Sequence, residues 1–245
     1  MTRSICFDPL SGRLHLTSGA FLALASVAVD RSVPQDQVDA LSRAGVLVDG
    51  ALHRALAPAL GAVTSPTAQL SVAVMEDAGC FVHQGWLSEV SGVLEDLGED
   101  MYDLLTVDTG SMPATIARLA GLTHRPTLEV GEVKVTEDQL DDLAAADPGA
   151  RRRASVAIAA ATPHVWTDWA RHMWAGEWRF IVVDVFWPNS SGGLTDRRIA
   201  VLDTAAGLTL VDASGSDMRL VPATPRVVWR LMLGLLPRAS EVHVH

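Results

Sequence analysis

The chain has 245 residues, of which 49% are hydrophobic and 20% are charged, and its formal net charge at pH 7 is −10. This composition is typical of a packed globular protein. The negative charge disfavours binding to the phosphate backbone of nucleic acids, and the single basic run at residues 151–153 is too short to reverse that expectation.

The cysteines and apolar runs bear on the compartment. There are two cysteines, Cys6 and Cys80, and no CxxC motif, which argues against a disulfide framework and predicts buried thiols in a reducing cytosol. No apolar run approaches the ~18 residues that cross a bilayer. Residues 20–29 are apolar enough for a signal peptide, but the preceding GRLHLTSG is more typical of a strand and turn than of a basic leader. We therefore expect a cytoplasmic protein without membrane insertion.

The first half of the chain predicts helices followed by a run of strands. Residues 13–16 alternate at the strand period, and helices are expected over about 19–29, over 34–44 and in a short leucine-rich segment near residue 56. A four-stranded antiparallel meander and a helix opened by Pro113 follow. The four strands are predicted at 68–77, 80–86, 89–96 and 101–107.

The second half predicts the same order of elements. A strand is expected over 127–135, a helix over 136–146 with Thr136 as its cap, and a long helix over about 151–174. Four further strands and a helix opened by Pro225 complete the chain. These strands are predicted at 177–187, 196–204, 207–213 and 217–223.

Two segments of the halves are also alike in sequence: PQDQVDALSRAG, from Pro34, and TEDQLDDLAAAD, from Thr136. Together with the repeated order of elements, this predicts an α+β fold with a pseudo-twofold duplicated architecture. Antiparallel meanders would form a central sheet with helices packed on one face. The half-repeats are residues 1–125 and 126–245, packed as one globular unit. Whether the two meanders join into one continuous sheet is left open.

Two stretches of the chain resemble the EspG family. The run LSRAGVLVDGALHRALAPALGAVTSPTAQLSVAV, residues 41–74, has the family's AGVL helix stop, Asp-Gly turn, short leucine helix and P-x-x-x-L-x-V lead-in to the first long strand. The segment VLDTAAGLTLVDASGSDMRLVPATPRVVWRLMLGLLP, residues 201–237, is similar to the family's last strands and closing helix. With the repeated order of elements, the likeness covers most of residues 13–237, and its motifs concern fold more than chemistry.

The resemblance implies a cytosolic chaperone of a type VII (ESX) secretion system. Proteins of this family are pseudo-twofold α+β proteins that grip an exposed apolar tip on helical PE–PPE substrate pairs. They are not enzymes and hold no metal or nucleotide cofactor. This chain departs from the family in the short hairpin at residues 75–80 and in the many tryptophans of residues 166–187, and both departures bear on the identity of the client.

The tryptophan-rich segment supplies the candidate binding residues. On a helix, Trp166, Trp169, Met173 and Trp174 fall within one broad face, which is typical either of a core or of a contact surface. Trp187 precedes Pro188 and a polar, glycine-rich loop, so it is the best candidate for exposure. The partner-binding site is therefore predicted at Trp169, Met173, Trp174, Trp187, Asn189, Ser190, Ser191, Gly192 and Gly193.

Two alternatives to a binding protein remain open. A small hydrolase or transferase would use His83, Asp184 or Asp203 in an unrecognised cleft, although the sequence has no GxSxG, P-loop or GxGxxG motif. A structural homodimer would bury the tryptophans in its own interface. The acidic side chains of residues 137–142 are interpreted as favouring the positive end of a helix rather than as an acid–base pair.

Overall fold

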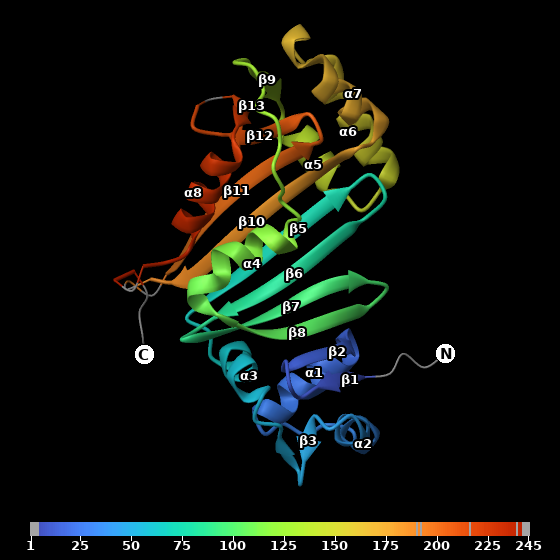
Figure 1. Cartoon of the computed structure of the whole chain (residues 1–245), viewed down its shortest axis with the longest axis vertical. Helices are drawn as coiled ribbons and strands as arrows, with labels where there is room; N and C mark the ends of the chain where they lie inside the picture. The colour runs from blue at the N-terminus through green and yellow to red at the C-terminus, as the bar shows by residue number, and fades with distance from the viewer. Residues whose placement is uncertain (1–4, 190, 192, 216, 239, 242–245) are drawn as a thin grey trace.

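The computed structural model of the chain describes residues 5–189, 191, 193–215, 217–238 and 240–241. An 11-stranded antiparallel sheet dominates this part of the chain, with the strand order β1-β2-β8-β7-β6-β5-β10-β11-β12-β13-β9, and β3 and β4 form a separate pair (Figure 1). The strands are β1 (Cys6–Asp8), β2 (Arg13–Thr17), β3 (Leu47–Val48), β4 (Ala51–Leu52), β5 (Ala68–Glu76), β6 (Cys80–Leu87), β7 (Val90–Gly98), β8 (Met101–Asp108), β9 (Val133–Val135), β10 (Trp178–Pro188), β11 (Leu194–Thr204), β12 (Gly207–Asp212) and β13 (Met218–Ala223).

The helices connect these strands. They are α1 (Ser18–Ala28), α2 (Gln35–Arg43), α3 (Ala57–Thr64), α4 (Met112–Leu119), α5 (Glu137–Ala144), α6 (Pro148–Ala160), α7 (Thr167–Ala175) and α8 (Pro225–Leu235), with short 3-10 turns η1 (Thr109–Ser111) and η2 (His164–Trp166). The class predicted from the sequence, α+β with a central sheet, is confirmed.

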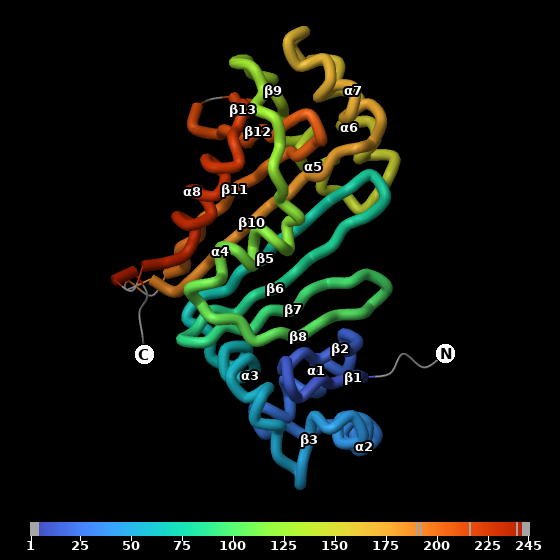
Figure 2. Tube along the Cα trace, in the orientation of Figure 1, coloured from blue at the N-terminus to red at the C-terminus, as the bar shows by residue number. Residues whose placement is uncertain are grey.

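The two meanders join at the centre of the sheet. β5 pairs with β10 in an antiparallel register that runs from Glu76 opposite Arg179 to Gln69 opposite Phe186. Outward from this pair, the order is β5, β6, β7, β8, β2 on one side and β10, β11, β12, β13, β9 on the other. Each half thus adds its four meander strands in sequence and then a short strand from before its helices, β2 in the first half and β9 in the second (Figure 2). β1 lies outside β2 at the edge of the sheet. The pseudo-twofold duplication stays a prediction.

Helices cover both faces of the sheet. One face, which we call the closed face, carries Leu70, Val72, Ile181 and Val183 and packs against α4 and α8. The opposite face, which we call the open face, packs against α1–α3 at one end and against α5–α7 at the other end (Figure 1). The prediction that helices lie on one face thus holds for six helices and is wrong for α4 and α8.

Local sequence signals explain where the helices begin and end. Thr136 caps α5 in a capping box with Gln139, as its position predicted. The long helix predicted over about 151–174 is instead α6, η2 and α7, because Pro163 cannot continue the hydrogen-bonded ladder of a helix. The strand predicted over 127–135 shrinks to β9, because β13 offers it a partner over only three residues.

The cysteine prediction is also corrected. Cys6 and Cys80 are both exposed, free thiols. Each stands at the first position of a strand, and neither points into one of the three hydrophobic cores.

Candidate functional site

The middle of the open face is not covered by helices. The closed-face side chains are buried over residues 68–74 of β5 and 181–187 of β10, whereas the open-face side chains are at least partly exposed over residues 69–73 and 182–186. This alternation follows from the two-residue period of a strand. Val82 on β6 and Arg198 on β11 extend the exposed region on either side of the central pair. The centre of the sheet is therefore accessible between the two groups of helices.

A hollow of about 900 Å³, which we call the groove, lies on this part of the open face beside α5. Apolar side chains make most of its lining. Its floor, on β5, β6, β10 and β11, carries Ala73, Met75, Val82, Phe180, Val182 and Ala200. We call α5, β12 and the start of β13 its wall, which carries Leu140, Ala144, Val211 and Met218. The pairing of β11 with β12 ends at Val201 and Leu210. The groove continues to this point, and its far end is lined by Leu210 and by Leu231 of α8.

Charged side chains also line the groove, and most of them are acidic. Glu137 and Asp141 come from α5, and Asp212 ends β12. Hydrogen bonds from Ser214 lower the pKa of Asp212, so this carboxylate stays charged at neutral pH. The one basic side chain, Arg198, is paired at 2.5 Å with Asp184 from the neighbouring strand.

The structure separates the residues of the predicted site. Trp169 and Met173 are fully buried against the sheet, and Trp187 is buried on the closed face below the guanidinium of Arg197. The expectation that Trp187 is the exposed tryptophan is therefore wrong. Trp174 is 55% exposed and is the one of these four side chains that a partner can reach.

The predicted loop lies away from Trp174. Asn189 orders it by accepting hydrogen bonds from the backbone N–H groups of Ser191 and Gly193, while Ser190 and Gly192 lie outside the described residues. β10 connects the end of α7 to this loop, and its 11 residues span roughly 35 Å. The sequence-predicted residues thus form no common surface, and sequence reasoning missed the groove.

The residues of the enzyme alternative do not share a cleft. His83 pairs directly with Val72 of the closed face, so its side chain lies on that face. Asp184 follows the closed-face residue Val183 in β10, so its side chain lies on the open face. Asp203 is 1% exposed and is engaged by two arginines. No two of the three side chains are arranged as an acid and a base that could act on one substrate.

His83 predicts a pH dependence of stability. Burial lowers the pKa of His83, and its Nδ1 accepts a hydrogen bond from the backbone N–H of Asp96, so the folded state holds the neutral ring. The unfolded chain binds a proton near pH 6.5. The free energy of unfolding should therefore fall as pH drops below about 6.5, until the folded histidine is also protonated.

Urea unfolding of the wild type and of His83→Gln at neutral and mildly acidic pH measures this effect. The variant should lose less stability on acidification than the wild type does. An equal loss in both proteins would show that other groups control the acid response.

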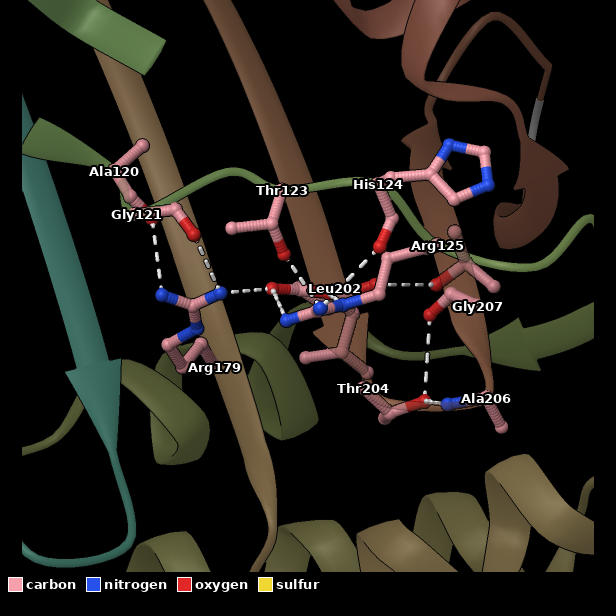
Figure 3. A network of polar contacts seen from close by, with 12 residues as sticks. Ala120, Gly121, Thr123, His124, Arg125, Arg179, Leu202, Thr204, Ala206 and Gly207 are labelled. Carbon is pink, nitrogen blue, oxygen red and sulfur yellow. Dashed lines mark hydrogen bonds and ion pairs between the residues drawn. The ribbon is translucent and has the colours of Figure 1, made fainter. Parts of the chain in front are cut away.

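A buried ionic network fixes the segment between the two halves. Asp203 on β11 accepts hydrogen bonds from Arg125, with Nε to Oδ1 at 2.7 Å, and from Arg179 of β10. Figure 3 shows the same arginine, Arg179, reaching the backbone of Ala120 and Gly121, where its Nη2 lies 2.8 Å from the Gly121 carbonyl oxygen. The network ties the end of α4 and the following linker to two strands of the second half.

Apolar side chains of α8 are also exposed, and one of them, Leu231, lines the far end of the groove. Exposed apolar side chains on this helix are Val227, Trp229, Leu231 and Leu233. At about 100° per residue, Val227 and Leu231 lie on one side of the buried stripe of α8 and Trp229 and Leu233 lie on the other, so the four do not form one patch. The homodimer alternative stays a prediction. Of the tryptophans in the chain, Trp229 and Trp174 are the two classed as exposed.

No known protein-family model matches the chain, and no curated protein shows significant sequence similarity to it. Within the described residues, no helix is both long and apolar enough to cross a membrane. The same part of the chain has no cluster of three or more histidine, cysteine and acidic side chains arranged to hold a metal ion.

Proposed function

We propose that the chain is a non-enzymatic, cytoplasmic, chaperone-like binding protein. It would mask an apolar helical tip of a type VII secretion substrate of the PE–PPE kind, as the likeness to EspG proteins implies. The observation that carries the proposal is the groove, where apolar side chains at the centre of the sheet stay accessible between two groups of helices. The mechanism is burial of the partner's apolar side chains on a surface that is already formed.

Its dimensions suit that role. A hollow of about 900 Å³ is large enough to take several apolar side chains of a helix. Covering about 300 Å² of apolar surface contributes roughly 7 kcal/mol at about 25 cal/mol per Å², before the cost of association. Small floor residues such as Ala73 and Ala200 let a partner helix approach the strands closely.

Val82 gives the sharpest test of this proposal. It is 40% exposed on the floor of the groove, so Val82→Gln should remove apolar contact with the partner while changing stability little. Val90 provides a matched control, because it is a strand valine with 38% exposure that does not line the groove. We expect Val82→Gln to weaken partner binding about tenfold and Val90→Gln to leave it unchanged.

The measurement is affinity purification of the tagged wild type and both variants from the native cell. We expect a helical secretion substrate to be recovered with the wild type and with Val90→Gln, and to be lost with Val82→Gln. Recovery that is equal for all three proteins, or no secretion substrate at all, would overturn the proposal.

A further inference from the structure

The charge of the groove indicates which helices it accepts. Three carboxylates line it, from Glu137, Asp141 and Asp212. Its one guanidinium, from Arg198, is neutralised by Asp184, and this hydrogen bond raises the pKa of Arg198 above its ordinary value. Because the groove is apolar at its floor and acidic at its wall, its field favours cations beside an apolar contact.

The position of the acidic side chains adds to this argument. Acids in the first turn of a helix are explained by the helix dipole, and Glu137 and Asp138 of α5 lie there. The dipole does not explain Asp141, which lies in the next turn, is exposed and faces the groove. α5 carries no basic residue at all, so nothing on this helix offsets its acidic side chains.

We propose that the groove takes an amphipathic helix of a partner protein whose apolar anchor residues are flanked by lysine or arginine. This inference rests on the proposed function and specifies the chemistry of the partner. The apolar anchors would lie on Ala73, Val82 and Val182, and the cationic side chains would reach Glu137 and Asp141 on α5. Exposed ion pairs add little affinity individually, so the charges mainly select the partner and raise the rate of association.

The test uses two synthetic helical peptides of about 20 residues, or about 30 Å in length. Both have the same leucine-rich apolar face, and their flanking residues are lysine in one peptide and glutamate in the other. Cys80 lines the groove and is exposed, so with Cys6→Ser as the background it becomes a single reporter thiol. Cys80 is exposed, but neighbouring protein atoms desolvate its thiol in part and raise its pKa, so alkylation is followed in mildly alkaline buffer.

We expect the lysine peptide to bind at least about tenfold more tightly than the glutamate peptide at low salt, and to slow alkylation of Cys80. High salt should reduce this preference, because the charges are at the surface. Glu137→Gln combined with Asp141→Asn should reduce it severalfold. Asp138→Asn combined with Asp142→Asn is the matched control, since it removes the same charge from the same helix at positions that do not line the groove.

Three other outcomes would contradict the proposed preference of the groove for a helix with flanking cations. Equal binding of both peptides with equal protection of Cys80 would overturn it while leaving an apolar binding groove intact. Equal effects of the two double variants would show that only the overall charge matters, and this would overturn the assignment to Glu137 and Asp141. Binding of neither peptide would also overturn it, and the proposed function would then be decided by whether the native partner co-purifies with the wild type and is lost with Val82→Gln.

Discussion

Replacing Asp203 by Asn should lower the free energy of unfolding by about 3 kcal/mol or more, because the change leaves two guanidinium groups without their shared carboxylate. Asp203 is 1% exposed, and the side chains of Arg125 and Arg179 are each 22% exposed. The new amide would turn an N–H₂ donor toward groups that are themselves donors. Equilibrium urea unfolding of the wild type and the variant gives the difference directly.

Asp217→Asn is the matched control for this prediction. Asp217 pairs with Lys134 at 2.9 Å, but both side chains are well exposed, so removing its charge should change stability little. The two variants have the same chemistry and differ in burial. A loss in Asp203→Asn that is no larger than the loss in Asp217→Asn would contradict the structural role of the network.

The network also has a consequence for Gly121. Its backbone has a φ of +59°, and a Cβ added there would lie 2.2 Å from Nη1 of Arg179. The left-handed conformation therefore favours glycine, and a side chain at this position would displace the Arg179 guanidinium from the network. Side chains of the second half thus hold the linker between the halves, and the division into two half-repeats stays a prediction.

Most strands could be predicted from the sequence because their signals are local. Alternation of apolar residues predicted β5, the turn at residues 77–79 marked the hairpin to β6, and the apolar run at residues 177–187 predicted β10. The same alternation places Trp187 in one row with Val183 and Val185, on the buried closed face. The following Pro188 suggests an exposed Trp187, whereas the alternation along β10 indicates that this side chain is buried.

The face of a helix is harder to predict when the apolar stripe is broad. Trp166, Trp169 and Met173 are buried, and Trp174 is exposed, although all four fall within one wide sector of a helical projection. Only the docking of α7 on the sheet separates them. Pro163 is a local signal that the helix before Trp166 ends, and it separates α6 from η2 and α7.

The groove could not be predicted because its parts come together through long-range pairing. β5 of the first half pairs with β10 of the second half. α5 lies between these two strands in the sequence, but in the fold it lies to one side of them. None of its lining residues forms a motif, and Val82 or Ala73 alone is typical of any strand. From the sequence alone, the helix dipole is the explanation for the acidic residues of α5, because the sequence does not show that the sheet lies beside this helix.

Trp169→Ala should lower the free energy of unfolding by about 3–5 kcal/mol, because it leaves a cavity in the core between α7 and the sheet. Trp169 is fully buried and packs edge-on against Trp166, with ring centroids 5.8 Å apart. Its Nε1 is buried and has no hydrogen-bond partner among the described residues, whereas Nε1 of Trp166 donates to the Glu129 carbonyl oxygen at 2.9 Å. The side chain therefore contributes through its volume and not through its polar group.

Trp169→Phe separates these two contributions. It keeps an aromatic ring and removes the unpaired N–H, whose burial is unfavourable, so the loss should be no more than about 1 kcal/mol. Trp174→Ala, in the same helix but exposed, should change stability by about 0.5 kcal/mol or less. Urea unfolding of the three variants is the measurement. If Trp169→Phe were as damaging as Trp169→Ala, or if Trp174→Ala were the most damaging of the three, the assignment of Trp169 to the core and of Trp174 to the surface would be overturned.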